Sequence, residues 1–163
     1  MPKIQFFYDY ICPYCKKGYE DLREFLDAHP KIEIEWIPVE AHPRPETYGS
    51  HTDLSCQSYY IARELGADMM AFHAAMFQAV AAERRNVEKV DVLVEIVKDL
   101  VDAEKFRSIL VTYKYRAQVE KNNDLAYEKS GVWFLPAFRA GGKKLDSRGG
   151  VGVSREEIRE FFN

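Results

Sequence analysis

Apolar and polar positions define the first part of the chain as two strands around a helix. The run Ile4–Ile11 is rich in aromatic and β-branched residues suited to a buried strand, and the positions after it switch to a helical period. His29 and Pro30 end that helix, and Ile32–Trp36 then alternates apolar and polar residues as a strand does. A right-handed crossover would make the two strands parallel.

The middle of the chain is predicted to be helical from Asp53 to about Lys129. The stretch before it, Pro38–Ser50, holds three prolines and shows no period, so we expect a loop there. Val87–Val101 also fits a period of two, but its length favours a helix. Asp102 is the expected cap of a further helix, and another is expected over Tyr113–Lys129.

The last part of the chain returns to strand character. Val132–Phe138 predicts a strand. Ala137–Ala140 and Lys143–Asp146 flank a Gly-Gly pair and predict a short hairpin, because glycine accepts the positive φ that primed turns need. Ser154 and Glu157 form a capping-box pattern, which predicts that a final helix opens there.

Composition limits the class of protein. A chain of 163 residues with 47% hydrophobic and 30% charged residues fits one globular domain, residues 1–163, with a helical insertion over about 53–130. A net charge of −3 gives no electrostatic footprint for nucleic acid. No apolar run approaches the ~18 residues of a membrane span, and the first residues do not resemble a signal peptide. We therefore expect a cytoplasmic protein that binds neither nucleic acid nor membrane.

Two thiols at the first strand-to-helix junction are the main candidates for chemistry. If Cys12 caps the helix and Pro13 is its first residue, the Cys12 sulfur faces unpaired backbone N–H groups and the positive end of the helix dipole, which favour a thiolate. Cys15 shares a helical stripe with Tyr19 and Leu22 and is expected to point inward. One exposed, activated sulfur and one sheltered sulfur suit attack followed by resolution.

Other candidate residues have simpler interpretations. A structural zinc site usually needs four ligands, and the sequence has no second C-x-x-C or H-x3-H pair. Cys56 is a lone cysteine, which is more often a small buried hydrophobe than a catalyst. His73 lies on the apolar face of a helix and is expected to be a hydrogen-bonded core residue. Met69, Met70 and Met76 are expected to be mostly core.

The order of elements and the residues around the cysteines resemble a known family. The pattern Asp9–Cys15 with Gly18, the proline-rich loop after Trp36, and Gly131-Val132 leading to Pro136 are similar to those of the DsbA family. The resemblance is closer to its cytoplasmic FrnE-like branch, a neighbour of the 2-hydroxychromene-2-carboxylate isomerases. It implies an α/β thioredoxin-like fold, β-α-β then β-β-α, with an all-helical insertion between the two halves.

The same resemblance implies roles for individual residues. Pro136 would be a cis-proline beside the cysteine pair, and the backbone of Leu135 would pair with the substrate chain. The Pro13-Tyr14 dipeptide differs from the Pro-His of DsbA and matches that of glutaredoxins, and such residues tune thiolate stability. Asp9 would take or relay the proton of Cys15, although from the residues alone it is equally a solvated residue at a strand end.

The first functional hypothesis is a thiol-disulfide oxidoreductase that uses Cys12 and Cys15 through a mixed disulfide. It requires no metal or organic cofactor, although exchange with glutathione is an option. Its substrate would be a protein or a low-molecular-weight thiol or disulfide, with a thioredoxin or glutathione system as redox partner.

Three alternatives stay open. One is a glutathione-dependent isomerase or transferase, although the related isomerases commonly place serine at the position of Cys12. Another is a non-catalytic peptide-binding or holdase module that uses a groove beside Pro136. The most remote is a zinc-bound dimer that shares two cysteine pairs.

Overall fold

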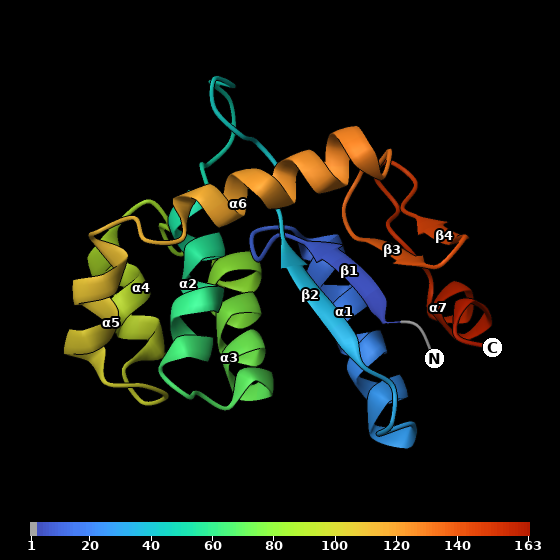
Figure 1. The fold of residues 1–163 in the computed structure, drawn as a ribbon, viewed down its shortest axis with the longest axis horizontal. Coiled ribbons are helices and arrows are strands. Elements are labelled where there is room, and N and C mark those ends of the chain that lie inside the picture. The colour runs from blue at the N-terminus through green and yellow to red at the C-terminus, as the bar shows by residue number, and fades with distance from the viewer. Residues whose placement is uncertain (1–2) are drawn as a thin grey trace.

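A four-stranded mixed sheet lies at the centre of the protein, for which the computed structural model describes residues 3–163. The strand order is β2-β1-β3-β4. Strand β1 (Ile4–Tyr8) runs parallel to β2 (Ile34–Pro38) and antiparallel to β3 (Ala137–Ala140), which pairs antiparallel with β4 (Lys143–Asp146) (Figure 1). This is the β-α-β and β-β-α arrangement of a thioredoxin-like fold, as the sequence predicts.

The aromatic sequence of β1 makes it the central strand. Phe6, Phe7 and Tyr8 are fully buried, because the strand has a neighbour on each edge and side chains packed on both faces. The Phe6 ring lies 4.8 Å from the ring of Phe138 on β3 and 5.5 Å, edge-on, from that of Trp36 on β2. Edge-to-face and tilted pairs of this kind add to the stability given by area burial.

Two helices, one from each half of the chain, pack beside each other next to the sheet. Helix α1 (Pro13–Ala28) connects β1 to β2, and α7 (Arg155–Phe161) follows β4 and packs beside α1. The predicted capping box opens α7: the Ser154 hydroxyl accepts the Glu157 N–H, and the Glu157 carboxylate accepts the Ser154 N–H. Each bond satisfies a backbone donor that the helix start leaves free.

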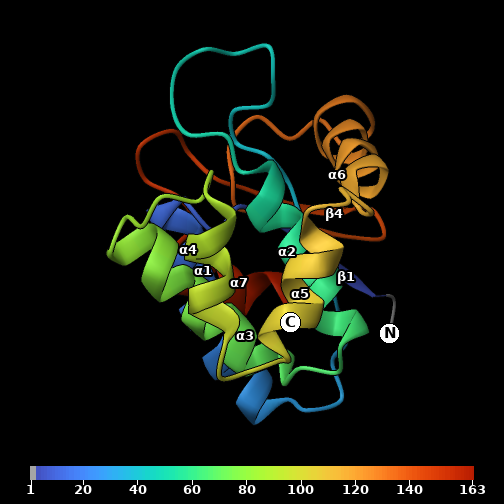
Figure 2. The same cartoon turned by 90° about the vertical axis from the view of Figure 1, so that its left-hand side faces the viewer.

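The helical insertion lies to one side of the sheet and then bridges back across it. Its first four α-helices gather beside β2, and α6 runs from them over the end of the sheet toward β3 (Figures 1 and 2). Its elements, including two π-helical turns, are α2 (Asp53–Glu64), α3 (Met69–Met76), η1 (Phe77–Ala82), α4 (Val90–Val97), α5 (Ala103–Leu110), α6 (Arg116–Asn123) and η2 (Asp124–Lys129). Within residues 3–163, none of the helices combines the length and the apolar character of a membrane span.

A hydrogen bond between Tyr10 and His73 joins the insertion to the turn that connects β1 to the cysteines. The Tyr10 hydroxyl lies 2.9 Å from His73 Nδ1, and the imidazole stacks on Trp36 with 4.1 Å between ring centroids. His73 is fully buried, which lowers its pKa to about 3 and keeps the ring neutral. His73 is a core residue, as predicted, but only Nδ1 is hydrogen-bonded: Nε2 is buried and has no hydrogen-bond partner among the described residues.

Several predicted boundaries are wrong by a few residues, and one predicted strand is largely absent. Strand β2 begins at Ile34 rather than Ile32, and α6 begins at Arg116 because Tyr113 has a positive φ of 56°. Of the predicted strand Val132–Phe138, only the last two residues enter β3. The preceding segment instead closes the helix, since the Val132 N–H donates to the Ala126 carbonyl.

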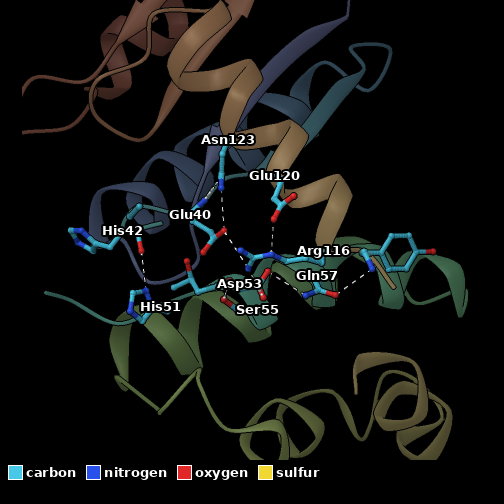
Figure 3. A network of polar contacts seen from close by, with 12 residues as sticks. Glu40, His42, His51, Asp53, Ser55, Gln57, Arg116, Glu120 and Asn123 are labelled. Atoms are coloured by element: carbon cyan, nitrogen blue, oxygen red, sulfur yellow. Dashed lines mark hydrogen bonds and ion pairs between the residues drawn. The ribbon is translucent and has the colours of Figure 1, made fainter. Parts of the chain in front are cut away.

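A polar network fixes the connection between β2 and α2 (Figure 3). The Asn123 side chain accepts the Glu40 N–H at 2.9 Å and donates to the Glu40 carboxylate at 3.1 Å. Arg116 lies 2.8 Å from the Asp53 carboxylate and 3.1 Å from that of Glu120. Because Glu40 is buried, these contacts from α6 fix the position of the backbone that leads into Ala41.

Replacing Arg116 with alanine is expected to lower the free energy of unfolding by about 1–2 kcal/mol. The change leaves the carboxylate of Asp53, which is only 12% exposed, without its cation, and the partial exposure of Arg116 keeps the loss below that of a fully buried pair. Arg107→Ala is the matched control, because its 2.6 Å pair with Asp91 is exposed and should contribute less than about 0.5 kcal/mol. Equal losses in urea denaturation of the two variants would contradict a structural role for the network.

Candidate active site

Cys12 caps the N-terminus of α1. Its backbone is extended, with φ −83° and ψ 118°, and its sulfur accepts the Cys15 N–H at 3.4 Å. Pro13 is the first helical residue, where a missing N–H costs no hydrogen bond. The predicted strand-to-helix geometry is therefore present, and the Cys12 sulfur lies at the positive end of the helix dipole.

The two thiols have opposite environments. The pKa of Cys12 is lowered, first by its contact with the Cys15 thiol and then by the N–H groups of Cys15 and Tyr14, against an opposing effect of partial burial. The pKa of Cys15 is raised well above its usual value, because this side chain is fully buried. Both sulfurs are free thiols in this structure, and the lower pKa of Cys12 makes it the more readily ionised of the two.

The segment before β3 forms the opposite wall of the site. The Leu135-Pro136 peptide bond is cis, and the Cys12 thiol donates to the Leu135 carbonyl at 3.7 Å. A Cβ on Gly18 of α1 would lie 3.1 Å from the Pro136 ring, so glycine permits the close approach of helix and loop. The Ser147 hydroxyl donates to the Pro136 carbonyl at 2.5 Å. The fold thus brings the Leu135-Pro136 pair next to the cysteines, although the two segments are about 120 positions apart in the sequence.

Asp9 lies beneath the site and is fully buried. Its carboxylate accepts the Thr52 hydroxyl at 2.6 Å, the Ala41 N–H at 2.8 Å and the Ile11 N–H at 3.3 Å. Burial raises the Asp9 pKa to about 6, in spite of these three donors. The interpretation of Asp9 as a solvated residue at a strand end is therefore wrong, whereas its role in proton transfer stays a prediction.

Exposed aromatic side chains line the same pocket as Cys12. Trp133 is 85% exposed, Phe134 53% and Tyr14 39%. They border a shallow pocket of about 190 Å³. Its lining residues are Cys12, Tyr14, Ala41, Tyr127, Trp133, Phe134, Leu135, Arg148, Gly149 and Gly150.

Several residues that line this pocket are not predicted from the sequence, including Trp133, Arg148, Gly149 and Gly150. A tryptophan next to phenylalanine just before a proline is an available signal, because a large aromatic pair in a loop has no core to enter. Thr52 was missed as well, and nothing local in the sequence identifies it as the partner of Asp9.

The third cysteine and the methionines lie away from this pocket. Cys56 is fully buried and its pKa is raised by that burial, as expected for a small core residue. Met76 is fully buried, and Met69 and Met70 pack partly buried against the core. Of the proline-rich loop, Ala41 lines the pocket. Within residues 3–163, no group of three or more His, Cys, Asp or Glu side chains is placed to hold a metal ion.

Known proteins are similar to this chain over almost its whole length. One relative in sequence, the uncharacterized protein YwbO of Bacillus subtilis, is 23% identical over 191 aligned positions that cover 95% of this chain and 94% of that protein. Among solved structures, a probable DsbA oxidoreductase from Streptomyces coelicolor matches with a TM-score of 0.79 and 16% identity, over 99% of this chain and 88% of that one. DsbA of Pseudomonas aeruginosa matches with a TM-score of 0.70 and 22% identity, over 99% and 81%.

These structures are under 25% identical to the chain and therefore show the fold. The family follows from a different comparison, because the sequence model for the DSBA-like thioredoxin domain matches residues 3–158. That match includes both cysteines, the helical insertion and the Leu135-Pro136 segment. The chain belongs to the family of DSBA-like thioredoxin domains.

Proposed function

We propose that the protein is a thiol-disulfide oxidoreductase in which Cys12 is the nucleophile and Cys15 the resolving thiol. The observation that carries the proposal is the difference between the two sulfurs. Cys12 is partly exposed at a helix N-terminus with a lowered pKa, and Cys15 is buried three residues later with a raised one. Attack by one sulfur and resolution by the other need this difference.

Each turnover would consist of two successive thiol-disulfide exchange steps. The Cys12 thiolate attacks one sulfur of a substrate disulfide, so that a Cys12–substrate disulfide forms and the other substrate sulfur leaves as a thiolate. Cys15 then loses its proton and attacks the Cys12 sulfur, which releases the second substrate thiolate. The enzyme dithiol is oxidised to a Cys12–Cys15 disulfide, and the substrate disulfide is reduced to two thiols. The oxidised enzyme would run the same steps in reverse on a substrate dithiol.

Asp9 is the group we assign to the proton of Cys15. It is buried, its charge acts on both thiols, and its pKa of about 6 lies near neutral pH. A general base is most effective when its pKa is close to the working pH. Thr52 and Ala41 would hold the carboxylate in place through their hydrogen bonds.

The finer features of the reaction belong to the same proposal. We infer a cytoplasmic protein of the FrnE-like branch, with a thioredoxin or glutathione system as redox partner and no resident metal or organic cofactor. The reducing potential of the cytoplasm would favour the dithiol form of the protein at equilibrium. Equilibration in glutathione buffers would fix the potential: a value near about −270 mV would indicate a reductant, and one near about −120 mV an oxidant.

Reaction with a small neutral disulfide tests the function. Reduced protein mixed with excess hydroxyethyl disulfide is expected to lose two thiols per chain and to form an internal Cys12–Cys15 disulfide, identified by peptide mapping. The rate should fall as pH drops below the lowered pKa of Cys12, because the thiolate is the attacking species. Loss of a single thiol, or loss at Cys56, would contradict the proposal.

A binding module without redox chemistry is the second candidate, favoured by the exposed aromatic residues Tyr14, Trp133 and Phe134. Contiguous apolar surface on a folded chain often marks an interaction site. A variant with both Cys12 and Cys15 replaced by serine separates the two functions. Client protection that survives in this variant would favour binding alone, and its loss would favour the oxidoreductase.

A further inference from the structure

Tyr127 joins the helical insertion to the loop that lies beside the reactive site. It belongs to η2, a π-helical turn in which the Ser130 N–H donates to the Leu125 carbonyl, five residues earlier. Turns of this kind inside helices occur frequently at functional sites. The Tyr127 side chain is partly buried against the hydrophobic core and also lines the pocket that contains Cys12. Its position therefore links the end of the insertion to the site.

A single peptide group connects the Tyr127 hydroxyl to the buried carboxylate of Asp9. The hydroxyl donates to the Glu40 carbonyl at 2.6 Å. The N–H on the other side of the same peptide group, that of Ala41, donates to Asp9 Oδ2 at 2.8 Å. Asn123, four residues before Tyr127, holds the same segment, because its side chain accepts the Glu40 N–H (Figure 3). The end of the insertion thus holds one of the donors on which Asp9 depends.

The hydrogen bond from Tyr127 strengthens the donor that faces Asp9. A hydrogen bond accepted by the carbonyl of a peptide group polarises its N–H, so that hydrogen bonds in a chain reinforce one another. A stronger donor to a carboxylate favours its charged form. Burial raises the pKa of Tyr127 well above its usual value, so its hydroxyl stays protonated and remains a donor throughout the neutral range. Tyr127 therefore acts against burial, which is the main cause of the raised Asp9 pKa.

The ionisable neighbours of Asp9 make its hydrogen-bond donors decisive. These neighbours become negative when they ionise, so they disfavour the carboxylate form. They are Glu40, Cys12, Cys15, Cys56 and Tyr127. The charged form of Asp9 is favoured by hydrogen bonds from Thr52, Ala41 and Ile11. A change in the strength of the Ala41 bond is therefore expected to change how readily Asp9 takes a proton.

We propose that Tyr127 is a positioning residue for the resolving step: through the Glu40-Ala41 peptide group, its hydroxyl holds and polarises the N–H donor that keeps Asp9 ready to take the Cys15 proton. The proposal rests on the proposed oxidoreductase function and on the role assigned there to Asp9. Tyr127 itself exchanges no proton and forms no bond with the substrate, and it acts on the reaction through Asp9.

The test separates the two exchange steps by their rates. Reduced protein is mixed in a stopped-flow instrument with an excess of a dipyridyl disulfide, which releases a coloured thione in each step. Attack by Cys12 releases the first thione at a rate that rises with probe concentration. Attack by Cys15 on the mixed disulfide releases the second at a rate that does not, and Cys15→Ala should abolish this second release. In the unmodified protein the second rate should rise with pH around a midpoint of about 6, the pKa of Asp9.

Tyr127→Phe is expected to move that midpoint upward by about half a pH unit, because the ring stays and only the hydroxyl is lost. The second rate should fall about threefold at about pH 5.5 and change little above about pH 8, whereas the first rate should change less than about twofold. The carboxyl carbon resonance of Asp9 should titrate with the same shift, which measures Asp9 independently of the kinetics. Tyr115→Phe is the matched control, since its hydroxyl donates to Glu64 at 2.5 Å outside the pocket, and it should shift neither midpoint.

The possible failures identify which claim is wrong. If Tyr127→Phe leaves the kinetic midpoint and the Asp9 titration unchanged, or if Tyr115→Phe shifts them equally, the inference is contradicted and the oxidoreductase function stands. An unchanged midpoint in Asp9→Asn would remove Asp9 as the base, and this inference with it. Release of one thione per chain instead of two by the unmodified protein would contradict the proposed function itself.

Discussion

Replacing Cys15 with alanine is expected to turn the protein into a covalent trap for its substrates. The substitution removes the contact with the Cys15 thiol, which is the largest cause of the lowered Cys12 pKa, so attack on a substrate disulfide becomes slower. It continues, because the backbone N–H groups of residues 14 and 15 still stabilise the Cys12 thiolate at the N-terminus of α1. Without the resolving thiol, the mixed disulfide is released only by an external thiol, and turnover with a peptide disulfide should fall by roughly a thousandfold or more. Non-reducing electrophoresis should show adducts that dithiothreitol removes.

The other two cysteines supply the controls for this experiment. Cys12→Ala should form no adduct, because the remaining thiol of the pair is buried and its pKa is raised. Cys56→Ala should behave as the unmodified protein does, since Cys56 is a fully buried core residue outside the pocket. Equal trapping by the Cys12 and Cys15 variants would refute the assignment of unequal roles.

Asp9→Asn is expected to raise the free energy of unfolding at pH 7 by about 2 kcal/mol while slowing the resolving step. The Asp9 pKa is about 6 in the folded protein and about 4 in an unfolded chain, so an ionised Asp9 opposes folding. An asparagine oxygen can still accept the two shorter hydrogen bonds, from Thr52 and Ala41, which both go to Oδ2. The longer bond from the Ile11 N–H is lost, which reduces the gain.

The pH dependence gives this prediction its signature. A raised pKa contributes stability that is present below pH 4 and is lost as pH rises through 6. The stability difference between the variant and the unmodified protein should therefore be smallest below about pH 4 and reach its full value above about pH 6. Asp91→Asn, which changes an 83% exposed carboxylate, is the control and should show less than about 0.5 kcal/mol throughout. A constant difference across this range would contradict the buried charge of Asp9.

Features set by local sequence were predictable. Cys12 as cap, Pro13 as first helical residue and Cys15 facing inward follow from capping rules and the helical period, which involve only neighbours in the chain. The hairpin around the Gly-Gly turn and the capping box at Ser154 were predicted with correct bounds for the same reason. Each is decided by interactions over fewer than ten residues.

Features set by tertiary contacts could not be predicted from the sequence. Val132–Pro136 has the composition of a strand, but its N-terminal end bonds back to the insertion and Pro136 offers no N–H to a ladder. The burial of Asp9 depends on donors at Ala41 and Thr52, more than thirty positions away. Trp133 is exposed because of where the fold places its loop, and the spacing of apolar residues in the sequence does not predict that position.

The hydrogen bond between Tyr10 and His73 limits which helical insertions this chain could accept. It ties the insertion to the turn between β1 and Cys12, and side chains of the insertion and of the sheet form one continuous hydrophobic core. Replacing the insertion with that of a relative would therefore disturb the region around Cys12. A foreign insertion would have to bring a partner for the Tyr10 hydroxyl and a ring to stack on Trp36.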